Sequence, residues 1–128
     1  MVKSKYISDI LDLLLDGDND FVSARQQLPF ITEDNFDYTG GGLFVRFSHS
    51  NEIKKYKVDK QDLILNGVKI QTTEYPIEAN ATLFFTEGLI DFLEIWCYLG
   101  DYPNQDLKKY TLSQEWANSP NKIITTEN

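Results

Sequence analysis

The sequence has few of the side chains on which metal sites and many active sites depend. Its 128 residues include one cysteine, Cys97, and one histidine, His49. A single cysteine excludes an intrachain disulfide. Metal sites and nucleophile–histidine dyads need further ligands or a reactive side chain near the histidine, and the SHSNE segment around His49 supplies neither. We therefore expect a solvated histidine, a buried and inert thiol, and neither a metal nor a cofactor.

The sequence also contains no hydrophobic run near the ~18 residues that a membrane-spanning helix needs. Three aspartates interrupt the N-terminal segment where the core of a signal peptide would lie: Asp9, Asp12 and Asp16. These observations predict a cytoplasmic protein without a membrane partner.

Basic residues are the minority among the charged ones. Lys and Arg number 12 and Asp and Glu number 20, which gives a formal net charge of -8. Contacts with nucleic-acid phosphates need clustered basic residues, so the composition argues against a nucleic-acid partner. An acidic protein favours a basic protein partner, although net charge also serves solubility. The locally basic segment KKYKVDK at 54–60 alternates lysine with apolar residues, which predicts the solvated face of an edge strand.

The N-terminal part of the chain carries helical patterns. Five apolar residues recur at the spacing of one helix face: Ile7, Ile10, Leu11, Leu14 and Leu15. Ser4 is the expected N-cap of this helix and Gly17 its expected end. A second short helix is expected over about 18–28, where Pro29 ends it.

From residue 30 onward the pattern changes to the alternation that is typical of strands. The segment 55–59 alternates in this way and predicts one of the strands. Asn66-Gly67, between two apolar runs, predicts a tight hairpin. Glu87-Gly88 predicts a second hairpin, whose later arm is apolar on both faces and is therefore expected to be central and covered on both sides.

Helices first and hairpins afterwards predict the fold class. We expect an α+β fold in which two N-terminal helices pack on a predominantly antiparallel sheet of about five to six strands. No repeat or linker divides the chain, so residues 1–116 are expected to form a single α+β domain. The polar segment 117–128 has little to bury and is expected to be a flexible C-terminal tail.

The segment YTGGGLFVRF at 38–47 contains three successive glycines, Gly40, Gly41 and Gly42. A phosphate loop would lead into a helix and carry Lys-Ser/Thr, whereas this one leads into a strand. A bend or bulge with positive φ is therefore the favoured interpretation. A backbone anion nest remains the alternative, with Arg46 and Arg25 as its cationic neighbours.

Four carboxylates lie on or beside the second predicted hairpin: Glu87, Asp91, Glu94 and Asp101. Glu94 falls between two aromatic residues of one strand face, which is costly for a carboxylate unless it is paired or exposed. Arg25 or Arg46 is its expected partner, because arginine binds carboxylates with two parallel hydrogen bonds. Three interpretations stay open: structural ion pairs, a surface for a basic partner, or an acid/base pair, for which nothing fixes two carboxyl groups at a working separation.

Three segments together resemble a group of small, acidic, uncharacterised bacterial proteins: RQQL at 25–28, YTGGGLFVRF at 38–47 and TLFFTEGLIDFLEIWCYLGDYP at 82–103. In that group an Arg-x-Gln-Leu helix end precedes a Thr-Gly-x-Gly-aromatic strand, and an acid-Gly turn and a Leu-Glu strand follow. The resemblance implies no catalytic residue. In size and charge the chain is also similar to toxin-neutralising immunity proteins, which is an analogy.

We therefore expect a non-enzymatic module that binds a basic protein, with an immunity protein that neutralises a basic toxin by occlusion as the specific candidate. The expected contact residues are the four carboxylates above, with Tyr98 and Tyr102 as exposed aromatic anchors. The alternative is a small-molecule or anion-binding domain with a pocket near Gly40–Gly42 and Arg46. The chain is expected to be a monomer or a homodimer.

Overall fold

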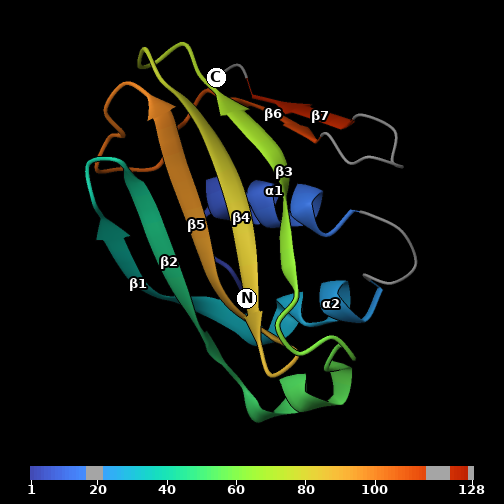
Figure 1. Cartoon of the computed structure of the whole chain (residues 1–128). Helices are drawn as coiled ribbons and strands as arrows, with labels where there is room; N and C mark the ends of the chain where they lie inside the picture. The colour runs from blue at the N-terminus through green and yellow to red at the C-terminus, as the bar shows by residue number, and fades with distance from the viewer. Residues whose placement is uncertain (17–21, 115–121, 127–128) are drawn as a thin grey trace.

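The computed structural model describes residues 1–16, 22–114 and 122–126, and it contains one antiparallel sheet with helices on one of its faces (Figure 1). The sequence prediction of an α+β fold is confirmed. The elements in chain order are α1 (Lys5–Leu14), α2 (Val22–Gln26), η2 (Leu28–Phe30), β1 (Ile31–Tyr38), β2 (Gly42–His49), η3 (Asn51–Tyr56), β3 (Ile64–Gln71), β4 (Glu78–Thr86), β5 (Leu89–Leu99), β6 (Thr111–Gln114) and β7 (Lys122–Thr125).

The sheet in the described ranges has seven strands in the order β1-β2-β5-β4-β3-β6-β7, and every neighbouring pair is antiparallel. This is more than the five to six strands that the sequence predicts. The additional strands lie at the two edges, where β1 is mostly exposed and β7 is only four residues long. Hydrophobic alternation is weak in β1, because little of its surface is buried, and four residues are too few to show a period in β7. The strand β7 also falls within segment 117–128, where the sequence predicts a tail.

Helix α1 covers one face of the sheet. The Ser4 side chain caps it by accepting a hydrogen bond from the backbone N–H of Ile7, as expected. Its apolar stripe is buried against β3, β4 and β6. The buried side-chain amide of Gln114 in β6 donates to the carbonyls of Leu13 and Asp16. A strand side chain thus provides hydrogen-bond donors for backbone carbonyls at the C-terminal end of the helix. The expected helix end at Gly17 lies outside the described residues.

The second helix ends at Gln26, earlier than the sequence predicts, and the expected start at residue 18 lies outside the described residues. After Val22–Gln26 the chain tightens into the 3₁₀ turn Leu28–Phe30, which contains Pro29. Gln27 lies between these two segments and is fully buried. Its amide nitrogen donates to the carbonyls of Tyr56 and Gly88, and its amide oxygen accepts from the N–H of Ile90. One side chain thus joins the helical segment to η3 and to the β4–β5 hairpin.

Two local predictions are wrong. The segment 55–59 is not a strand, because Asn51–Tyr56 form the 3₁₀ helix η3, which buries Ile53 in the core. The lysines of this segment therefore do not line an edge strand. Asn66-Gly67 is not a hairpin turn but a bulge within the continuous strand β3, since Leu65 pairs with Leu83 and Val68 with Ala81.

The β4–β5 hairpin is confirmed, with its turn at Glu87 and Gly88, both at positive φ. Along β5 the side chains that face α1 are buried, including Leu93, Ile95 and Cys97. The opposite face is not covered by the described residues, because Trp96 is 58% exposed and Tyr98 41% exposed. The prediction that both faces of this strand are covered is therefore wrong, although the strand is central.

Candidate functional site

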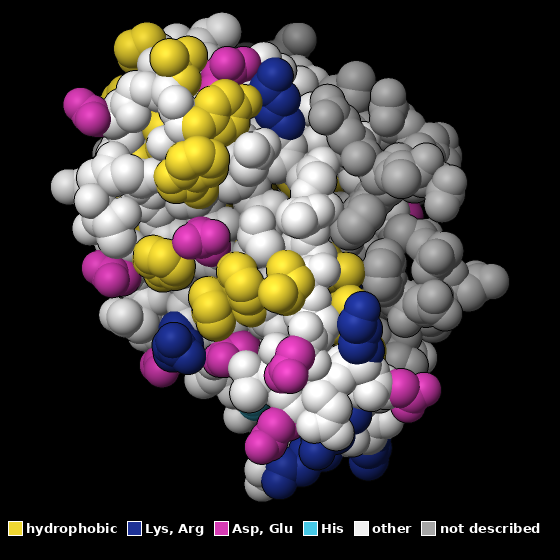
Figure 2. All heavy atoms as spheres, in the orientation of Figure 1, with side chains coloured by type: hydrophobic (Ala, Val, Ile, Leu, Met, Phe, Trp, Pro, Cys, Tyr) yellow, Lys and Arg dark blue, Asp and Glu magenta, His cyan; other side chains and the backbone are white. Residues whose placement is uncertain are grey.

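The face of the sheet opposite α1 carries an unusual number of exposed apolar side chains. Figure 2 shows hydrophobic side chains gathered across this face and interrupted by acidic and basic ones. The exposed or half-exposed apolar residues that it contributes are Phe44, Ile64, Phe84, Phe92, Trp96 and Tyr98. Large exposed apolar side chains that gather on one face of a protein often mark a surface that contacts another molecule. We refer to this surface as the open face.

The strand register arranges the open face in three rows that cross the sheet. The first row runs through Arg46, Phe92, Phe84 and Ile64. The second row runs through Phe44, Glu94 and Thr82, beside the bulge of β3. The third row runs through Gly42, Trp96, Asn80 and Lys69.

The first row is mostly apolar, and its one charged residue, Arg46, forms an ion pair with Asp91. The rings of Phe84 and Phe92 are stacked, with centroids 4.5 Å apart. The guanidinium of Arg46 lies over the Phe92 ring, 5.3 Å from its centroid, and one of its nitrogens lies 3.1 Å from a carboxylate oxygen of Asp91. The hydroxyl of Thr86 donates to the other oxygen of Asp91 at 2.8 Å. Arginine, aromatic ring and carboxylate thus form one unit.

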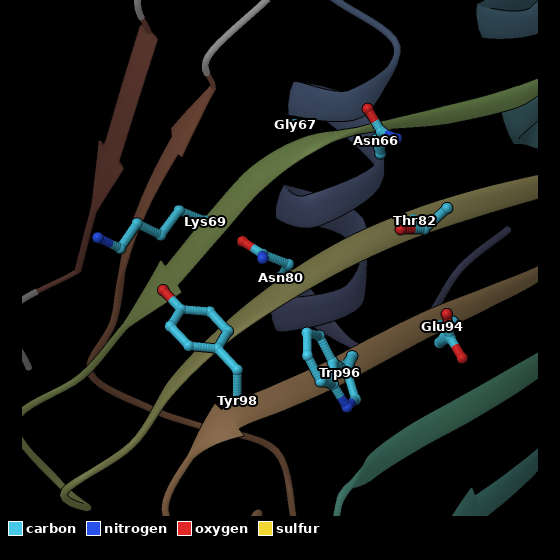
Figure 3. A pocket seen from close by; sticks show the side chains of 8 residues that line it. All are labelled: Asn66, Gly67, Lys69, Asn80, Thr82, Glu94, Trp96 and Tyr98. Atoms are coloured by element: carbon cyan, nitrogen blue, oxygen red, sulfur yellow. The ribbon is translucent and has the colours of Figure 1, made fainter.

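The second and third rows border a shallow hollow of about 700 Å³ (Figure 3). Strands β3, β4 and β5 supply its lining residues, which are Asn66, Gly67, Lys69, Asn80, Thr82, Glu94, Trp96 and Tyr98. Its polar groups are two side-chain amides, a threonine hydroxyl, the Glu94 carboxylate and the Lys69 ammonium, and its aromatic groups are one indole and one phenol. The rings of Trp96 and Tyr98 are tilted against each other at a centroid distance of 6.0 Å. Such a lining can both stack against a flat group and hydrogen-bond to it.

Glu94 has neither of the partners that the sequence predicts. Arg25 binds a carboxylate oxygen of Asp12 at 2.5 Å and the Asp12 carbonyl at 2.7 Å, next to α1. Arg46 binds Asp91. The Lys69 ammonium in the same hollow lies 3.4 Å from Glu78. Within the described ranges, then, the half-buried carboxylate of Glu94 is beside aromatic rings while the nearby cations bind other acids.

The other predicted contact residues are spread over the hairpin. Glu87 is exposed in the turn and Asp101 is exposed beyond the opposite end of β5, so the four carboxylates do not form one patch. Tyr98 lines the hollow. Tyr102 is only 4% exposed, and its hydroxyl lies 2.7 Å from that of Tyr6. Burial raises the pKa of the Tyr102 hydroxyl, and a residue in this position is a core residue rather than an exposed anchor.

The glycine segment Gly40–Gly42 forms a bend of the backbone, which is the interpretation that the sequence favours. Gly40 has a φ of +82°, and the carbonyls of Gly40 and Gly41 accept hydrogen bonds from the N–H groups of Tyr102 and Cys97. Gly42 lies so close to β5 that a Cβ added there would be 1.9 Å from the carbonyl oxygen of Ile95. The segment thus closes the end of the β1–β2 hairpin onto β5.

The alternative pocket is not assembled around these glycines. Arg25 lies beside α1 on the covered side of the sheet, whereas Arg46 lies on the open face, and each binds a different carboxylate.

The two residues that could carry reactive chemistry are placed as the sequence predicts. His49 is exposed at the end of β2, and one of its ring nitrogens contacts the carbonyl oxygen of Ile90. Cys97 is buried, and burial raises the pKa of its thiol, which donates to the Leu99 carbonyl. Among the described residues no group of three or more His, Cys, Asp or Glu side chains is arranged to hold a metal.

Several residues of the open face are not among the contact residues that the sequence predicts. Phe44, Asn80 and Thr82 belong to it because they alternate with the buried residues of β2 and β4. That alternation is visible in the sequence, since Ala79, Ala81 and Leu83 mark the covered side of β4. Asn66 joins the hollow through the bulge, which the sequence presents as a turn.

Comparison with known protein families, with curated proteins and with solved structures finds no significant match to this chain. In the described part of the chain, no helix is long and apolar enough to cross a membrane.

Proposed function

We propose that this protein is a non-enzymatic module that binds a basic protein through the open face. The observation that carries the proposal is the set of exposed apolar side chains on a sheet face that α1 does not cover. Phe44 of β2 is 37% exposed, Trp96 of β5 58% and Ile64 of β3 53%, and all three project from the same face of one sheet. Aromatic side chains on a rigid support are the usual anchors of protein contacts.

The charge of the chain supports a basic partner in particular. The net charge of -8 attracts positively charged proteins over distances of about a Debye length. On the open face itself Glu94 is placed to meet a cation, and Arg46 and Lys69 are each bound to an acid of the same face. The aromatic residues would contribute affinity, and the acidic residues would raise the association rate and contribute specificity.

The specific candidate remains an immunity protein, which would act by covering the active site of a basic toxin. Stoichiometric binding through a preformed surface requires no catalytic group on the binding protein. The small-molecule or anion-binding alternative near Gly40–Gly42 gains no support from the arrangement of its arginines.

Capture of partners from a lysate of the cells that make the protein tests this proposal. We expect the wild-type protein to retain a basic protein at physiological salt and more of it at low salt. The double variant Phe44→Ser/Ile64→Ser should retain at least tenfold less, because it removes two exposed anchors without touching the buried side of the sheet. A matched control is Phe36→Ser, because Phe36 is also an exposed aromatic residue, with 38% of its surface exposed. Phe36 pairs with the buried Val45 of β2, so the two side chains lie on the side of the sheet opposite the open face.

Equal capture by the wild type and the double variant would contradict binding through the open face. If the captured protein is an enzyme, the immunity proposal further requires that one equivalent of this protein abolishes its activity. Self-capture in place of a basic partner would point to a homodimer and contradict the proposal.

A further inference from the structure

The open face contains two aromatic–carboxylate pairs, and only one of them has an arginine. In the first pair Phe92 and Asp91 are adjacent on β5, and Arg46 of β2 lies directly across from Phe92 in the strand register. The guanidinium covers the ring at 5.3 Å and binds the carboxylate at 3.1 Å. This unit shows how a guanidinium is held on this surface.

The second pair is Trp96 and Glu94, which lie on the same side of β5. The residue directly across from Trp96 on β2 is Gly42. Where the first pair faces an arginine, the second therefore faces a residue without a side chain. The side of Trp96 toward β2 is consequently free of any β2 side chain at that register position, and the indole is 58% exposed.

The hollow beside the second pair offers the hydrogen-bond acceptors that a guanidinium needs. Across from Trp96 and Glu94 on β4 lie Asn80 and Thr82, and their side-chain oxygens can accept hydrogen bonds (Figure 3). A guanidinium has five N–H donors in one plane, and it stacks on indole while binding a carboxylate. A lysine ammonium has three donors around a point charge and cannot stack in this way.

We propose that the hollow formed by Glu94, Trp96, Asn80 and Thr82 is a receptor for an arginine side chain of the partner protein. The arginine lies against the Trp96 indole, and its nitrogens bind the Glu94 carboxylate. This inference rests on the proposed function, because it names the side chain that the open face recognises. It also explains why Glu94 lies among aromatic residues with the nearby cations bound elsewhere.

A titration with N-acetyl-L-arginine methylamide tests the site without the partner. We expect amide and indole chemical shifts in two-dimensional nitrogen–proton spectra to move at Trp96, Asn80 and Thr82, with a dissociation constant in the millimolar range. The lysine analogue should bind at least fivefold more weakly, because it cannot stack and bind the carboxylate at once. N-acetyl-L-glutamine methylamide, which is neutral, should produce no saturable shift.

Three variants test whether the chemical-shift changes come from binding at the hollow. Glu94→Gln should weaken the arginine analogue at least fivefold, and Trp96→Ala should abolish saturation. Glu87→Gln is the matched control, since Glu87 is an exposed carboxylate in the turn of the same hairpin, and it should leave binding unchanged. The spectra of the free variants show that each is folded.

Equal shifts with the arginine and lysine analogues would overturn the proposal, as would unchanged binding by Glu94→Gln. Saturable binding of the neutral glutamine analogue would also overturn it, because the hollow would then recognise an amide rather than a cation. This result is separable from the proposed function. If the titration fails while Phe44→Ser/Ile64→Ser still loses capture, the arginine site is wrong and the open face remains the contact surface.

Discussion

Replacing Gln27 with leucine is expected to lower the free energy of unfolding by about 3–5 kcal/mol. The leucine would fill a similar volume but would leave the Tyr56 carbonyl and the Ile90 N–H without these partners. The Gly88 carbonyl would keep only the hydrogen bond from the Val58 N–H. Gln27 is 0% exposed, so water cannot replace the lost hydrogen bonds without opening the structure. Urea unfolding followed by circular dichroism measures the change.

Gln26→Leu is the matched control, because Gln26 is exposed at the end of α2. We expect it to change the free energy of unfolding by less than about 0.5 kcal/mol. A loss below about 1 kcal/mol for Gln27→Leu would show that the amide does not hold the helical segment to the hairpin. The second glutamine of the RQQL segment would then have no structural explanation.

The second large effect concerns the three glycines. Gly42→Ala is expected to destabilise the protein by about 3 kcal/mol or more, because its Cβ would lie 1.9 Å from the carbonyl oxygen of Ile95. The clash is with the backbone of the central strand β5, so β2 and β5 would have to separate. The measurement is again the midpoint and slope of urea unfolding.

The neighbouring glycines supply internal controls. Gly41 has no heavy atom within 4 Å of an added Cβ, and Gly41→Ala should leave stability within about 0.5 kcal/mol of the wild type. Gly40 also has space, but its φ of +82° should make Gly40→Ala cost about 1–2 kcal/mol. Destabilisation by Gly41→Ala that equals that of Gly42→Ala would contradict the close contact between β2 and β5.

How far the fold follows from the sequence depends on whether a signal is local. The first helix is predictable because its cap and its apolar stripe lie within one segment. The β4–β5 hairpin is predictable because apolar runs flank its acid-Gly turn. The Asn66-Gly67 dipeptide has the same local form but is a bulge, since the pairing of Leu65 and Val68 with β4 decides its conformation. Glycine at positive φ serves either role.

The candidate site is less predictable, because its rows join strands that are distant in the sequence. The chain alone shows that Glu94 and Trp96 share a strand face, and it shows the glycines before residue 43. The register that places Gly42 across from Trp96 and Arg46 across from Phe92 follows only from the pairing of β2 with β5. The exposure of Trp96 is also a tertiary property, because an apolar strand face can equally be covered by another layer.

The affinity of the captured partner for two single variants decides whether the open face is the contact surface. Isothermal titration calorimetry should show that Trp96→Ala weakens the complex at least 30-fold, as expected for the loss of an aromatic anchor worth about 2 kcal/mol or more. Phe36→Ala removes another exposed aromatic ring on the opposite side of the sheet and should change the affinity less than twofold. The reverse order, with Phe36→Ala harmful and Trp96→Ala neutral, would contradict binding through the open face.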